Sequence, residues 1–143
     1  MNQMLTQDEI KQLILAALEA RSMAYAPYSY YHVGAALFTA DGKIFQGGNI
    51  ENASYGATNC AERTAFFKAV SEGKRDFRAI AIAGGMAGEE PADYAYPCGI
   101  CRQVMQEFCR DDFQVIVAKS EADHKVYTLA ELLPFGFGGE SIQ

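Results

Sequence analysis

The stretch TNCAERTAFF, Thr58–Phe67, places a cysteine and a glutamate two residues apart, at Cys60 and Glu62, where an apolar run begins. The spacing predicts a helix over Cys60–Glu72, and Gly73 follows where a helix commonly ends. A thiol at a helix start lies beside free N–H groups and the positive end of the helix dipole, which lower its pKa. The stretch therefore predicts a thiolate with a carboxylate on the same helical turn.

A second stretch, YPCGICRQVM, Tyr96–Met105, holds the pair Cys98 and Cys101. Pro97 favours an extended entry into the helix that we expect at Gly99–Cys109. Side chains three residues apart are neighbours on a helix, so both sulfurs lie on one side of its first turn. The pair alone is typical of metal sites and of redox-active thiols, and the third cysteine has to decide between them.

An apolar strand at Ala79–Ala83 is expected between the two helices. A right-handed crossover would place both helix starts at one edge of the sheet, so three thiolates could converge on one ion. Zinc suits sulfur ligands, and three protein ligands leave a fourth position for water. Glu62 could take a proton from such a water and pass it to a leaving group. Zinc with three thiolates keeps one net negative charge, which Arg63 and the helix ends would offset.

The rest of the chain indicates an α/β fold in which helices cover a sheet that carries a hairpin at one end. Thr6 and Glu9 resemble a capping box at the start of a helix. Asp41-Gly42 suits a tight primed turn in the hairpin. The expected elements are a helix at about Gln7–Met23, hairpin strands at Val33–Thr39 and Lys43–Gly47, strands at Val115–Ala118 and Lys125–Leu129, and a short helix at Leu129–Leu133.

Length and charge narrow the classes of function. The 143 residues fit one domain, residues 1–143, and a net charge of -6 disfavours nucleic acid as a partner. The polar start MNQMLTQDEIKQ is unlike a signal peptide, and no apolar run is long enough to cross a membrane, so we expect a cytoplasmic protein. In a reducing compartment the four cysteines favour metal binding or chemistry over disulfides.

The motifs taken together resemble the small cytidine deaminases of nucleoside salvage, which are zinc enzymes. The resemblance extends from about Leu13 to Phe137 and rests on YAPYS, VGAAL, GNIENASY, CAERTA, PCGICRQ and ELLP, in the order of that family. It implies a three-layer α/β/α fold around a mixed five-stranded sheet. It also implies one Zn²⁺ per subunit, a pyrimidine nucleoside as substrate and a homotetramer, with neither nucleic acid nor a membrane as partner.

The resemblance also implies roles for residues of the metal centre. Cys60, Cys98 and Cys101 would bind zinc, and the activated water would attack C4 of the base. Glu62 would carry protons between this water, ring nitrogen N3 and the departing ammonia. Arg63 would donate hydrogen bonds to the thiolates.

A second set of roles concerns the substrate. Asn49 and Glu51 would bind the ribose hydroxyls, and alternate residues of a strand would point them to one side. The backbone N–H of Ala61 would contact the base. Tyr31 would pack on the base, and a neighbouring subunit would lend Phe137 to the pocket.

Three features depart from the pattern of the family. Tyr31 stands where phenylalanine is common, and its hydroxyl needs a polar partner or water. In the tail LLPFGFGG, Phe135 competes with Phe137 for the stacking role. The segment MAGEEPADYAYP, Met86–Pro97, is longer than expected, and the sequence assigns residues 87–96 no function.

Two alternatives to nucleoside deamination stay open. One keeps the chemistry but acts on a nucleoside antibiotic or on cytosine in a polynucleotide, although no basic stripe interleaved with aromatic residues supports the latter. The other is a redox or structural zinc module, which leaves Glu62 without a role. The remaining candidates have structural interpretations: Cys109 as a small buried residue, and His32 and His124 as structural or solvent-facing.

Overall fold

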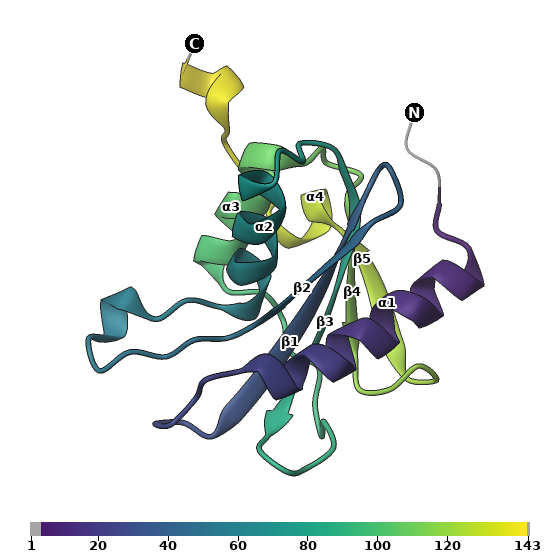
Figure 1. Ribbon diagram of the computed structural model, residues 1–143. Helices are drawn as coiled ribbons and strands as arrows, with labels where there is room; N and C mark the ends of the chain where they lie inside the picture. Colours follow the sequence, from purple (N-terminus) through teal and green to yellow (C-terminus); the bar gives the residue numbers. More distant parts are fainter. Residues whose placement is uncertain (1–3, 143) are drawn as a thin grey trace.

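The structure is a computed structural model that describes residues 4–142, and Figure 1 shows the arrangement of its elements. Residues 1–3 and 143 lie outside the described residues. They belong to the expected domain 1–143, and residues 1–3 also belong to the polar start of the chain. The helices are α1 (Gln7–Ala20), α2 (Ala61–Ser71), α3 (Gly99–Phe108) and α4 (Leu129–Leu132), with short 3₁₀ turns at Arg21–Met23, Tyr55–Ala57 and Gly139–Ile142. The strands are β1 (Tyr31–Thr39), β2 (Ile44–Gly48), β3 (Phe77–Met86), β4 (Gln114–Ala118) and β5 (His124–Thr128).

The strands form one five-stranded sheet in the order β2-β1-β3-β4-β5. Strand β1 runs antiparallel to both β2 and β3, so these two outer strands run in the same direction. Strands β3 and β4 are parallel, and β5 returns antiparallel beside β4. The expected mixed sheet is confirmed, and the carboxyl ends of β2 and β3 meet at one edge. The segments that lead to α2 and α3 start from this edge.

Helices cover both faces of the sheet, with α1 across one face and α2 and α3 across the other (Figure 1). Alternation along the strands produces the two layers of core, because successive side chains point to opposite faces. On β1, Leu37 packs with Phe66 of α2, whereas Ala36 packs with Leu13 and Ala17 of α1. This arrangement confirms the three-layer α/β/α architecture.

Gly47 lets α2 lie very close to the edge strand β2. A Cβ atom on Gly47 would lie 2.6 Å from the backbone nitrogen of Ala65 and 2.7 Å from the carbonyl oxygen of Ala61. No side chain fits at these distances, so only glycine permits this approach. The contact fixes the height of the first turn of α2 above the sheet.

Some boundaries and one turn differ from the sequence predictions. The first helix ends at Ala20 and passes into a 3₁₀ turn, Arg21–Met23, so only its last turn is tighter than expected. The primed turn predicted in the hairpin is wrong. Gly42 has a φ of 91°, but Asp41 is not among the described residues with positive φ, as a type I′ turn would require. Within residues 4–142, no helix has the length and apolar character needed to cross a membrane.

Candidate metal centre and substrate pocket

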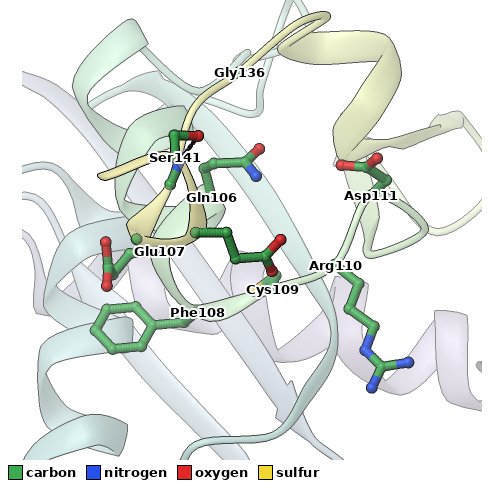
Figure 2. A pocket seen from close by; sticks show the side chains of 11 residues that line it. Gln106, Glu107, Phe108, Cys109, Arg110, Asp111, Gly136 and Ser141 are labelled. Atoms are coloured by element: carbon green, nitrogen blue, oxygen red, sulfur yellow. Dashed lines mark hydrogen bonds between the residues drawn. The ribbon is translucent and has the colours of Figure 1, made fainter. Parts of the chain in front are cut away.

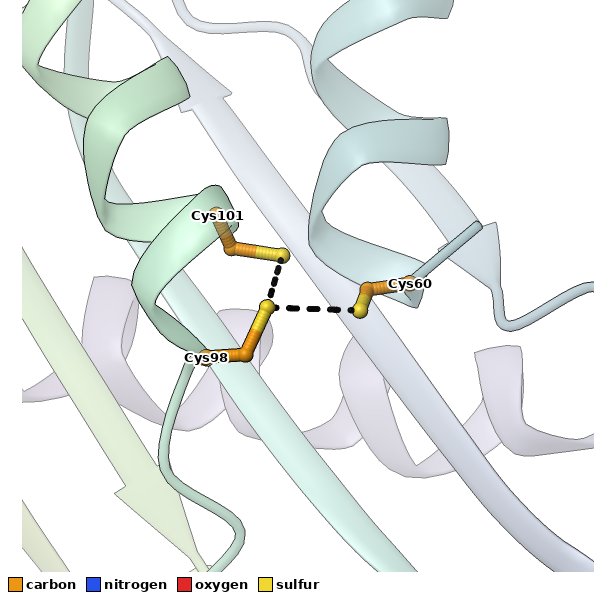
Figure 3. A group of neighbouring side chains, drawn as sticks. All are labelled: Cys60, Cys98 and Cys101. Atoms are coloured by element: carbon orange, nitrogen blue, oxygen red, sulfur yellow. Dashed lines mark hydrogen bonds between the residues drawn. The ribbon is translucent and has the colours of Figure 1, made fainter. Parts of the chain in front are cut away.

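Three cysteines converge from two helix starts (Figure 3). Cys60 is the N-cap of α2 and Cys98 is the N-cap of α3, and neither caps its helix through a side-chain hydrogen bond. Cys101 lies one turn into α3 and is buried. The predicted convergence is thus confirmed, and it follows from the shared direction of β2 and β3.

The spacing of the sulfurs fits a single metal ion. The Sγ atom of Cys98 lies 3.6 Å from that of Cys60 and 3.4 Å from that of Cys101. A tetrahedral site with zinc–sulfur bonds of about 2.3 Å separates its sulfurs by about 3.8 Å. Among the described residues, these three cysteines are the one group of three or more potential ligands that could hold a metal ion.

The surroundings of the cluster favour the thiolate form of Cys60. The pKa of Cys60 is lowered to about 5, first by a hydrogen bond from the Cys101 thiol and then by Arg63, although burial acts in the opposite direction. Arg63 donates from Nη2 to the Sγ of Cys60 at 3.3 Å. Its guanidinium therefore lies where it offsets the negative charge of a zinc–thiolate centre, as expected from the sequence.

Glu62 is a buried carboxylate beside this cluster. Only 4% of the residue is exposed. Burial raises the pKa of Glu62 to about 7, and the charge on Cys60 also raises it, whereas its own backbone N–H and Arg63 act in the opposite direction. A carboxyl group whose pKa lies near neutrality can both accept and release a proton at working pH.

A cavity of about 390 Å³ opens beside the cysteines and Glu62. Tyr31, at the start of β1, and Ala61, the first residue of α2, both line it. The backbone N–H of Ala61 has no partner within its helix, so it is free to donate into the cavity. Gly84 leaves room for the tyrosine, since a Cβ there would lie 3.0 Å from the Tyr31 hydroxyl.

Asn49 also lines this cavity, but its side chain is already engaged. Its Oδ1 accepts from the backbone N–H of Val33 at 2.9 Å, and its Nδ2 donates to the carbonyl of Tyr31 at 2.9 Å. One amide hydrogen and one lone pair remain for a ligand. Strand β2 ends at Gly48, so Asn49 lies in an extended segment beyond the strand on which we expected it.

Glu51 lies in an adjacent cavity of about 420 Å³, which shares Thr58 with the first. Its carboxylate accepts hydrogen bonds from the backbone of Tyr28 and Ser29, at 3.0 and 3.1 Å, and from the Ser29 hydroxyl at 2.5 Å. The Ser29 hydroxyl bond lowers the pKa of Glu51. The carboxylate is thus a fixed anion in the cavity adjacent to that of the cysteines.

The C-terminal tail lies away from the cysteine cavity of its own chain. Gly136 and residues 138–141 line a separate hollow at the far end of α3, shown in Figure 2. Gln103 donates to the carbonyl of Phe137 at 2.9 Å, while the Phe137 residue is 60% exposed. Phe135 is fully exposed. Neither ring lines the cavity beside Glu62.

Sequence reasoning missed part of the cavity wall. Thr58, Tyr94, Ala95 and Tyr96 all line it. The position of the two tyrosines directly before Pro97 and Cys98 was the available signal, because any segment that leads into a metal ligand lies near the metal. By contrast, Cys109 is half-buried against the core, and burial raises the pKa of its thiol, in accord with a structural role.

The comparisons with known proteins match this chain to deaminases. Residues 7–117 match a family model described as the cytidine and deoxycytidylate deaminase zinc-binding region. A cytidine deaminase of Halalkalibacterium halodurans is 50% identical over 132 residues, 92% of this chain and 96% of that protein. A crystal structure of cytidine deaminase from Burkholderia pseudomallei, 49% identical, superposes with a TM-score of 0.80 over 88% of this chain and 97% of that chain. A blasticidin-S deaminase of Bacillus cereus is 32% identical over 131 residues, 88% of this chain and 90% of that protein.

Proposed function

The chain belongs to the cytidine deaminase family, and from this we propose that it converts cytidine and 2′-deoxycytidine, with water, to uridine and 2′-deoxyuridine plus ammonia, as a step of pyrimidine salvage. One observation carries the proposal. A buried carboxylate, Glu62, and three converging thiols, those of Cys60, Cys98 and Cys101, line or border one cavity of nucleoside size. The alternative function, a redox or structural zinc module, would leave Glu62 without a role.

Glu62 carries the protons of the reaction. Zinc, when held by Cys60, Cys98 and Cys101, supplies a Lewis acid that lowers the pKa of a coordinated water to about 7. Glu62 accepts a proton of the attacking water and delivers it to N3 of the base. It then takes the remaining proton from the new hydroxyl on C4 and passes it to the amino group, so that the C4 carbonyl forms, the C4–N bond breaks and ammonia leaves. A pKa of about 7 suits both directions of transfer.

The other cavity residues hold the nucleoside. Asn49 and Glu51 bind the ribose hydroxyls, since the Asn49 amide lines the cavity of the cysteines and the fixed Glu51 carboxylate lines the adjacent cavity. The Ala61 N–H donates to the base, and the face of the Tyr31 ring packs on it. Arg63 keeps the thiolates charged through its bond to Cys60.

The active unit is a homotetramer in which a neighbouring subunit supplies Phe137, or Phe135 in its place. The exposure of both rings, and their absence from the cavity of their own chain, support this part of the proposal. A reducing compartment, the cytoplasm, suits four cysteines that are all free thiols.

A nucleoside antibiotic is the second candidate substrate, because one relative bears the name blasticidin-S deaminase. Its identity of 32% lies below the 50% of the cytidine deaminase relative, which favours cytidine. A polynucleotide is disfavoured by a net charge of -6.

The proposal is tested by following the fall in ultraviolet absorbance of cytidine with zinc-loaded protein, before and after a strong chelator. We expect turnover that the chelator abolishes and added zinc restores. Free cytosine should react far more slowly than cytidine if Asn49 and Glu51 bind ribose. Turnover of blasticidin S without turnover of either cytidine or deoxycytidine would refute the proposed substrate.

A further inference from the structure

The segment Met86–Pro97, which leads from the last residue of β3 to the start of α3, forms one wall of the metal cavity. Its last residues, Tyr94, Ala95 and Tyr96, line the cavity together with Cys98. Tyr94 and Ala95 also pack against the core on the α2 and α3 side of the sheet. The segment thus lines the cavity and leads directly into Cys98, one of the three cysteines of the metal centre.

Tyr94 is held from outside the cavity by the turn between β4 and β5. Its hydroxyl donates to Oδ1 of Asp123 in that turn. The ammonium nitrogens of Lys119 and Lys125 lie 4.8 and 4.9 Å from the centroid of its ring. Both distances fit cation–π contacts. The hydrogen bond to Asp123 raises the pKa of Tyr94 to about 12, so its hydroxyl remains a donor at neutral pH.

Tyr96 is held by the same hairpin through a second contact. Its hydroxyl oxygen lies 3.1 Å from that of Tyr127 on β5, and the two ring centroids are 5.8 Å apart. Strand β5 pairs with β4, where Tyr127 lies opposite Val115 of the core. Asp123 and Tyr127 therefore anchor both tyrosines, although neither anchor lines the cavity.

The position of this wall indicates which part of the substrate it meets, provided that the proposed function holds. The carbon that loses its amino group, C4, has to lie at the cysteine cluster, and the ribose lies toward Asn49. The segment that leads into Cys98 then faces the edge of the base that carries C4 and C5.

We propose that Tyr94 and Tyr96 determine specificity at this edge, by limiting the substituents accepted at C5 and N4 of the pyrimidine, and that Asp123 and Tyr127 are positioning residues that hold this wall. The hairpin β4–β5 thus acts on substrate choice without touching the substrate.

The experiment compares kcat/KM for cytidine and for 5-methylcytidine. Tyr96→Ala should raise the value for 5-methylcytidine relative to cytidine by about tenfold, the scale on which a pocket discriminates one methyl group. Tyr127→Phe and Asp123→Ala should each raise the ratio by about threefold, as expected for one lost hydrogen bond. Glu121→Gln, in the same turn but ion-paired with Lys11, is the matched control and should leave the ratio unchanged.

A double variant separates positioning from a general loss of stability. If the hydroxyl pair is the link, Tyr96→Phe and Tyr127→Phe should change the ratio equally, and the double variant should change it no further. These variants keep both rings, so they remain informative if Tyr96→Ala fails to fold. If the wild type deaminates cytidine but the ratio is unchanged in all the tyrosine and Asp123 variants, the inference is overturned and the proposed function stands. Zinc-loaded wild type without turnover of cytidine would overturn both.

Discussion

Glu62 combines burial with a place beside three thiols, and the proposed reaction needs both properties. Burial keeps its pKa near 7, where it exchanges protons readily. Glu62→Gln preserves the shape of the side chain and removes this exchange. We expect kcat for cytidine to fall by about 10²–10⁴-fold, the usual share of general acid–base catalysis, while zinc content stays near one per chain.

The control for this variant is Glu72→Gln, which changes the exposed C-cap carboxylate of the same helix. It should retain the activity of the wild type. Zinc analysis of both proteins separates loss of proton transfer from loss of metal. If Glu62→Gln deaminated cytidine at the rate of the wild type, Glu62 would have no part in the mechanism.

Asp41 gives a residue-scale prediction for stability. A hydrogen bond from Lys74, 2.8 Å away, and a second from Thr39 lower the pKa of Asp41 to about 2, from an ordinary value of 3.8. Because the folded-state pKa is depressed, the contribution of Asp41 to stability is present above its unfolded pKa and is lost as pH falls toward 2. We therefore expect Asp41→Asn to unfold at lower urea concentration than wild type at neutral pH.

Urea unfolding at several pH values checks this sign. The difference in midpoint between the two proteins should stay constant down to a pH of about 4 and shrink below it. Asp93→Asn, in the exposed loop after β3, is the control. A difference that grew on acidification would contradict the assignment.

At the scale of elements, the contact between α2 and β2 decides where Cys60 and Glu62 lie. Gly47→Ala would force Cβ against the backbone of Ala61 and Ala65, so α2 would have to move away from the sheet. We expect a loss of stability of about 1–3 kcal/mol from overpacking, together with a fall in kcat, because the first turn of α2 carries Glu62, the proposed proton carrier.

Gly56→Ala is the matched control, since a Cβ there meets no atom within 4 Å. Thermal unfolding and cytidine turnover are measured on both variants. Equal effects of the two substitutions would show that the close approach at Gly47 has no particular importance.

For the molecule as a whole, the sequence predicts the elements and the metal centre better than it predicts the outer pocket. Apolar periodicity and caps depend on neighbours along the chain, which is why the helix after Cys60 and its end at Gly73 are confirmed. The primed turn at Asp41 failed because Asp-Gly also suits a longer turn with positive φ at glycine alone. The anchoring of Tyr94 by Asp123 depends on how β5 pairs with β4, and no local pattern encodes that contact.

At the scale of the assembly, the cavity beside Glu62 is lined by neither Phe135 nor Phe137 of the same chain. If a neighbour supplies Phe137, a subunit with Phe137→Ala still offers an intact metal centre, and a subunit with Glu62→Gln still offers an intact tail. Each homogeneous assembly should have low activity. Mixed assemblies, formed by co-expression, should regain activity because some sites combine an intact Glu62 with an intact Phe137 from another chain.

Co-expression of the two variants with different affinity tags, followed by tandem purification, yields the mixed protein, and its cytidine turnover is compared with that of each parent. Repeating the co-expression with Phe135→Ala in place of Phe137→Ala tells which of the two rings enters the cavity of a neighbouring subunit. Sedimentation shows whether an assembly contains both chains. If such a mixed assembly regains no cytidine turnover with either phenylalanine variant, each site is built from a single chain. The exposure of Phe137 would then serve subunit contacts alone, and the roof of the pocket would have to come from Tyr31 and the wall at Tyr94 and Tyr96.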